Sequence, residues 1–211
     1  MKTAQSINEQ RRTGQSARSR TPLGTSLGLL ASCAIAGLLA LFAFYLSLVA
    51  TSSPVGVGDR AKVDRAIEVL REKGFDREAF LLRHVVTFRG SDNWLNAVTK
   101  QDNAYAATNF PFQVITLYPD FFDKAADDME RAMVLLHEAQ HLQGADEAGA
   151  YSYVWKHRAQ LGWTQIKYGD SPSYVTISEQ TRDYAPDLFT CPNKVWNDCT
   201  ETLESAVSSK R

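Results

Sequence analysis

The sequence LLHEAQHLQGADE, residues 135–147, predicts a helix, a tight turn and the start of a second helix. The first helix should cover about residues 123–143, with acidic side chains in its first turns, where they favour the helix dipole. Gly144 stops this helix, and the second should run from residue 146 or 147 to about residue 161. The pattern therefore predicts a helical hairpin.

The two histidines of this stretch have the spacing of a metal site. His137 and His141 are four residues apart, so they share one helical face with Cβ atoms roughly 5–6 Å apart. Glu138 points about 100° around the helix, where its carboxylate can address a metal-bound water. Glu147 is the best third ligand, because only a glycine-hinged turn separates it from His141. Three protein ligands and one open position are typical of a catalytic zinc ion, with Glu138 as general base.

Three further side chains near the motif are candidates for supporting roles. Tyr151 lies one turn after Glu147, so it either bonds a ligand or the oxyanion, or belongs to the core. His157 could stabilise a tetrahedral intermediate, although a lone helical histidine is more often structural. Asp146 is by default a helix cap, with a supporting bond to the site or direct ligation as alternatives. If Glu147 is not a ligand, a different residue, such as Asp146, Glu179 or Glu201, completes the site.

The residues from Gln113 to Gln160 resemble the HExxH zinc metallopeptidases, the zincins. A strand is expected at residues 113–118, then the motif helix, then an acidic residue that opens the next helix. The spacing to Gly144 and residue 147 matches metzincins, but all three methionines lie upstream of the motif, so a Met-turn is absent. A glutamate as third ligand makes the gluzincin branch the closer one.

This resemblance implies a small zincin-like α+β domain that hydrolyses peptide or protein substrates with zinc. In the superfamily the strand before the motif helix commonly lines the cleft. Residues 113–118 would then either bind an extended peptide by strand addition or form an internal strand.

The N-terminal part of the chain has the composition of a membrane anchor. Residues 1–22 carry five basic side chains and one acidic side chain, and are expected to be a disordered cytoplasmic tail. Residues 23–50 lack charge, and 27–50 are long enough to span about 30 Å of hydrocarbon. A linker at 51–58 leads to an extracytoplasmic domain at 59–211. The sequence thus predicts a single-pass protein of the cell membrane, with a cleaved signal peptide as the alternative.

Charge and cysteine usage agree with this organisation. The whole-chain net charge is −1 and residues 1–58 carry +4, which leaves −5 on the domain and argues against nucleic acid as a partner. Cys33 lies in the apolar segment. Cys191 and Cys199 bracket a short loop and are expected to form a disulfide, with a metal pair or free thiols as alternatives.

The remaining elements are predicted from local patterns. An amphipathic helix should cover residues 60–73 and a strand should lie within 80–88. A capped short helix should follow Ser91. After residue 168 we expect mostly loops, a strand at 174–177 and a short helix from Asn197.

Together these observations predict a membrane-anchored zinc peptidase. The principal alternative is a catalytically inactive metal-binding interaction domain anchored to the membrane. Proteolysis within the membrane is disfavoured because the motif lies far beyond the only apolar segment.

Overall fold

The computed structural model describes residues 22–99, 104–194 and 197–200. The chain divides into two compact units, residues 1–43 and 44–211. Helix α1 (Pro22–Ala50) contains a segment, Leu27–Ala50, that is long and apolar enough to cross a membrane. The predicted basic tail lies outside the described residues, apart from the proline that opens α1.

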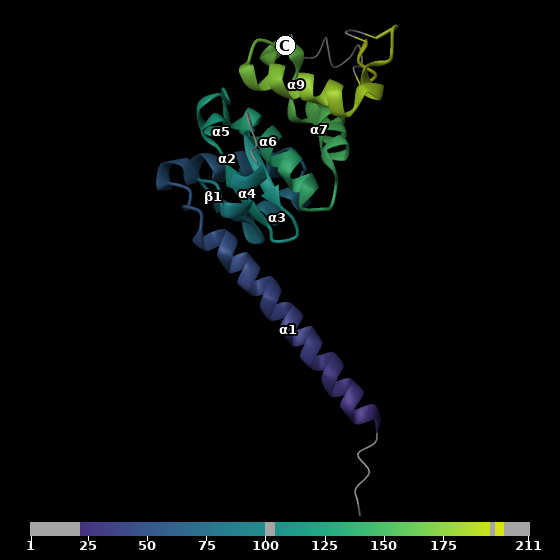
Figure 1. The fold of residues 1–211 in the computed structure, drawn as a ribbon. Helices are drawn as coiled ribbons and strands as arrows, with labels where there is room; N and C mark the ends of the chain where they lie inside the picture. The colour runs from purple at the N-terminus through teal and green to yellow at the C-terminus, as the bar shows by residue number, and fades with distance from the viewer. Residues whose placement is uncertain (1–21, 100–103, 195–196, 201–211) are drawn as a thin grey trace, which may run out of the picture. The chain divides into compact units, whose positions relative to one another are not determined.

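The second unit is a mixed α+β fold, as predicted (Figure 1). Its sheet has three strands, β1 (Thr87–Arg89), β2 (Ala106–Asn109) and β3 (Val114–Leu117), in the order β1-β3-β2. Strand β1 runs parallel to β3, and β2 runs antiparallel to it. All four side chains of β3 are buried.

The predicted strand at residues 113–118 is therefore correct, but it is internal. Both backbone edges of β3 pair with neighbouring strands, so β3 cannot bind a peptide by strand addition. Within the described residues, the free edge on this side of the sheet belongs to β2.

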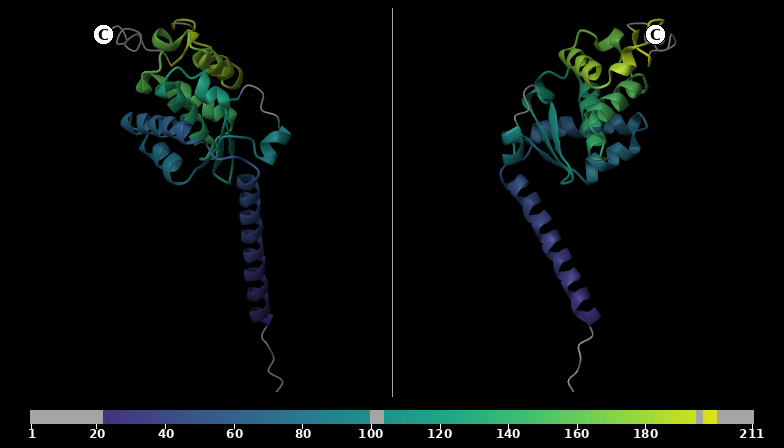
Figure 2. Two further views of the ribbon diagram at one scale, coloured as in Figure 1. Left: turned by 90° about the vertical axis from the view of Figure 1, so that its left-hand side faces the viewer. Right: turned by 45° about the vertical axis from the view of Figure 1, so that its right-hand side comes forward.

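Helix α6 (Asp128–His141) is at the centre of the domain. It packs against α2 (Val57–Glu72), α3 (Asp76–His84) and α7 (Glu147–Leu161). Figure 2 (right) shows the strands at one side of the domain and α7 at the other, together with α9 (Pro172–Tyr184), which packs on α7. The smaller elements are α4 (Trp94–Thr99), α5 (Pro119–Asp123), α8 (Gln165–Tyr168) and the 3₁₀ turn η1 (Pro186–Phe189).

Local hydrogen bonds define the ends of the hairpin helices. Asp127 caps α6 by accepting from the backbone N–H groups of residues 129 and 130, and Asp146 caps α7 by accepting from the N–H of Gly149 at 2.8 Å. Gly144 has φ +87°, a left-handed conformation that suits glycine at the end of a helix. The hairpin is confirmed, but α6 begins later than predicted, because Asp127 caps its first turn and the separate helix α5 ends at residue 123.

One predicted strand is helical in the structure, and another is helical over most of its range. Residues 76–84 form α3, and only Thr87 and Phe88 of the expected 80–88 region lie in a strand, β1. Residues 174–177 belong to α9, where Ser171 caps the helix and Pro172 occupies its first turn. The expected loop region after residue 168 is therefore wrong as well. The predicted helix at 60–73 and the Asn93-capped helix α4 are confirmed.

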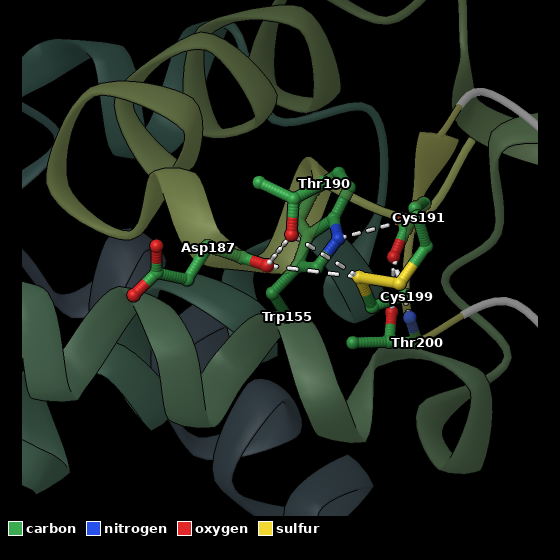
Figure 3. Close-up of a disulfide and its surroundings, with 7 residues drawn as sticks. Trp155, Asp187, Thr190, Cys191, Cys199 and Thr200 are labelled. Atoms are coloured by element: carbon green, nitrogen blue, oxygen red, sulfur yellow. Dashed lines mark hydrogen bonds between the residues drawn. A yellow bond between two sulfur atoms is a disulfide. The ribbon is translucent and has the colours of Figure 1, made fainter.

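The predicted disulfide between Cys191 and Cys199 is present (Figure 3). Asp198, beside it, accepts hydrogen bonds from Trp155 Nε1 at 2.8 Å and from Arg158 Nη2 at 2.7 Å. Both donors lie on α7, so the buried carboxylate of Asp198 connects the disulfide loop to that helix by hydrogen bonds. The helix predicted from Asn197 extends into residues that are not described.

Candidate metal centre

The side chains of His137, His141 and Glu147 lie close together near the turn of the helical hairpin. Their ligand atoms all lie within 4.8 Å of one another. The two Nε2 atoms are 3.0 Å apart, and the two Glu147 carboxylate oxygens lie 3.3 Å from His137 Nε2 and 3.6 Å from His141 Nε2. As predicted from the sequence, the turn at Gly144 brings Glu147, the first residue of α7, close to the two histidines.

This donor set fits a cation. Two neutral imidazoles that present Nε2 lone pairs to each other at 3.0 Å repel unless a proton or a metal ion lies between them. Two imidazole nitrogens and a carboxylate are also the ligand types that zinc takes in proteins. The group can therefore hold a metal ion.

The ring of His141 is oriented by the turn itself. Its Nδ1 lies 2.8 Å from the carbonyl oxygen of Ala145, which can only accept, so Nδ1 carries the proton. Nε2 is then the atom presented to a metal. His137 Nδ1 is buried without a hydrogen-bond partner among the described residues, and its ring packs on Tyr151 with centroids 4.3 Å apart.

The pKa values of the cluster show how strongly these groups interact. Hydrogen bonds from both imidazoles hold the pKa of the Glu147 carboxyl well below its usual range. Burial alone would lower the pKa of His141, but the hydrogen bond to Glu147 and the charge of Glu138 outweigh it and raise that pKa to about 9. At a pH below this pKa, His141 Nε2 carries a proton, which a metal ion has to displace before it can bind.

Glu138 lies beside the cluster and is only 4% exposed. Its Oε2 accepts a hydrogen bond from Thr108 Oγ1 at 2.7 Å. Thr108 belongs to strand β2, which the sequence analysis did not identify. Nothing in the sequence marks Thr108, because it lies thirty residues from its partner and the contact depends on how the sheet packs on α6.

A cleft of about 550 Å³ opens over these residues. The free-edge strand β2 forms one wall, with Ala106, Ala107 and Thr108 in the lining. Helix α9 forms another wall through Ile177, Gln180 and Tyr184. The cleft is therefore bounded by a sheet edge on one side and a helix on the other.

Tyr151 is part of this cleft. Its hydroxyl donates to Gln180 Oε1 at 2.7 Å, and its ring stacks on Tyr184 with centroids 5.2 Å apart. Burial and nearby carboxylates raise its pKa above the usual range, so the hydroxyl keeps its proton. Tyr151 thus couples α7 to α9 next to His137.

The other sequence candidates lie elsewhere. His157 is not in the cleft lining, and its Nδ1 bonds the carbonyl oxygen of Tyr153 while its ring packs on Phe75. Asp146 caps α7, and Glu179 is exposed outside the cluster. Glu201, the last alternative ligand, is outside the described residues.

Comparisons of the chain with protein-family models, with curated proteins and with solved structures found no match.

Proposed function

We propose that this protein is a membrane-anchored zinc peptidase. The observation that carries the proposal is the convergence of His137, His141 and Glu147 beside the buried Glu138, in a cleft bounded by a free strand edge. Such a set is the minimum that metal-assisted hydrolysis requires, namely three ligands, a nearby base and access for substrate.

His137, His141 and Glu147 would hold the zinc ion, which when bound supplies a Lewis acid and a water of lowered pKa. The bond from Thr108 fixes Glu138 Oε2, which leaves Oε1 to accept the proton of the attacking water. Protonated Glu138 can then deliver that proton to the departing amine. Glu138 is almost fully buried, which limits the access of bulk water to its carboxylate.

Strand β2 supports a peptide as the substrate. Among the described residues no strand pairs with its outer edge, which offers backbone donors and acceptors to an extended chain. The small side chains Ala106 and Ala107 leave room beside this edge in the cleft. An extended peptide that pairs with β2 would pass next to Thr108 and the base that it bonds.

The anchor and its orientation complete the proposal. Five basic residues before the apolar segment favour a cytoplasmic N-terminus, so the domain would lie outside the cytoplasm. The disulfide between Cys191 and Cys199 agrees with that compartment.

The test uses the full chain purified in detergent. It should contain about one zinc ion per chain and cleave an unstructured protein. Glu138→Gln should retain the zinc and lose turnover, whereas Glu179→Gln, which alters an exposed carboxylate outside the cleft, should change neither. Undiminished cleavage by Glu138→Gln would overturn the mechanism. Zinc binding without any cleavage by the wild type would favour the metal-binding interaction domain.

A further inference from the structure

An apolar patch lies beside the end of helix α1. The patch consists of Trp94, Val98 and Phe110, which are 41%, 75% and 57% exposed. Trp94 and Val98 are four residues apart and share one face of α4. Phe110 is in the turn between β2 and β3. Large apolar side chains grouped on a surface mark a site of interaction.

Aromatic contacts join this patch to the last turns of α1. The ring of Phe44 stacks on Phe112 with centroids 4.6 Å apart and meets Trp94 edge-on at 5.4 Å. Trp94 Nε1 donates to Ser47 Oγ at 3.1 Å. Trp94 therefore joins the patch to the end of the helix.

Further bonds hold the same turns rigidly to the domain. Arg89 Nη2 donates to the carbonyl oxygen of Val49 at 2.9 Å, and the Tyr45 and Thr87 hydroxyls lie 3.0 Å apart. Leu48 is completely buried. Residues 44–50 thus behave as part of the folded unit, in agreement with its boundary at Phe44.

The length of the apolar segment places these turns at a membrane surface. Leu27–Ala50 contains 24 residues, and about 20 suffice to cross the hydrocarbon core. The last turn or two of α1 would then lie in the headgroup region. Tryptophan and tyrosine are enriched at that depth, because one end of each side chain is apolar and the other polar.

We propose that the Trp94, Val98 and Phe110 patch docks on the lipid bilayer that α1 enters. Lipid is the occupant that the observations favour, because the patch continues the surface of an apolar helix whose end is fixed against it. Docking buries the three side chains in the interfacial region and holds the domain in one orientation on the membrane.

This orientation has a consequence for the substrate, which rests on the proposed peptidase function. Phe110 also lines the cleft, as does Thr99, the neighbour of Val98, so the cleft adjoins the docked surface. The opening would then face polypeptide segments that lie against the bilayer. Its preferred substrates would be membrane-proximal stretches of other proteins.

The test measures contact with lipid in the full chain, reconstituted at low density in phosphatidylcholine vesicles. In a Cys33→Ser background, Val98→Cys and Phe110→Cys each carry an environment-sensitive fluorophore. Matched controls carry it at Ile166→Cys and Val175→Cys, which alter exposed apolar residues of α8 and α9. The vesicles contain lipids with a spin-label quencher close to the headgroup.

Docking predicts blue-shifted emission and loss of emission by the lipid quencher at both patch positions, with solvent-like, unquenched emission at both controls. Solvent-like emission at the patch would overturn the proposal. Blue-shifted emission without quenching would also overturn it, because protein rather than lipid would then surround the fluorophore. Equal quenching at the controls would show that the domain has no fixed orientation, again against the proposal.

The same measurement in Glu138→Gln separates this inference from the proposed function. The quenching pattern does not require turnover, so it should persist in that variant. Docking can therefore be measured even if the protein has no peptidase activity.

Discussion

Replacing Asp198 with asparagine should destabilise the domain strongly. Its carboxylate lies 2.7 Å from Arg158 Nη2, and both side chains are only 3% exposed. Asparagine keeps the size of the side chain but removes its charge. Arg158→Met in the Asp198→Asn background then removes the opposite charge as well.

The magnitude follows from the burial of this pair. Removing one partner of a buried ion pair costs about 3–5 kcal/mol, because the desolvated guanidinium of Arg158 then loses its charge interaction with the carboxylate at 2.7 Å. For a domain of this size, that loss corresponds to a fall in Tm of roughly 6–20 °C. Removing both charges should cost distinctly less than Asp198→Asn alone.

Thermal and urea unfolding of the full chain in detergent, followed by circular dichroism, measures both variants. The free energy of unfolding should recover in part when Arg158→Met is added to Asp198→Asn. A loss below about 1 kcal/mol for Asp198→Asn, which is the range of an exposed pair, would refute the argument. So would a double variant less stable than the single one.

Three further predictions concern the metal, the disulfide and the pH. Zinc at about one hundred times its Kd should stabilise the wild type by about 2.7 kcal/mol, and Glu147→Ala should require much more zinc for the same rise in Tm. The double variant Cys191→Ser, Cys199→Ser should lower the free energy of unfolding by about 2.5 kcal/mol, the value that the chain-entropy model gives for so short a loop. A reductant should have no further effect on the unfolding of this variant by urea. Burial and the hydrogen bond to Asp127 raise the folded-state pKa of Tyr168, so its contribution to stability is complete below about pH 10 and is lost as the pH rises further. Tyr168→Phe should flatten the alkaline part of the stability profile measured by urea unfolding, and an unchanged slope would contradict this assignment.

The errors of the sequence analysis have physical causes. Residues 80–88 are rich in apolar and aromatic side chains, which favour strands, but Asp76 and Arg83 place charges at the helix ends that suit the dipole. Ala79 and Leu82 then bury one face of α3. In α9 the β-prone residues 174–177 are helical because Ser171 caps the helix and buried side chains recur at helical spacing. Packing outweighs β-propensity in both places, aided by the terminal charges of α3 and by the Ser171 cap of α9.

Local chemistry allowed the hairpin and its cluster to be predicted. The spacing of His137 and His141, the stop at Gly144 and the cap at Asp146 act over a few residues, so they can be recognised before the fold is known. The short loop between Cys191 and Cys199 can also be recognised from neighbouring residues alone. The length of the apolar segment 27–50 follows directly from the number of consecutive uncharged residues.

The tertiary structure alone decided which groups surround that cluster. Thr108 reaches Glu138 because β2 pairs outside β3, and Tyr184 reaches Tyr151 because α9 packs on α7. Likewise, Trp94 meets the end of α1 only when α4 folds against it. These contacts join residues that are far apart in the chain, and their geometry depends on the packing of the whole domain. For that reason the cluster of His137, His141 and Glu147 could be predicted from the sequence, whereas the cleft around it and the patch beside the end of α1 could not.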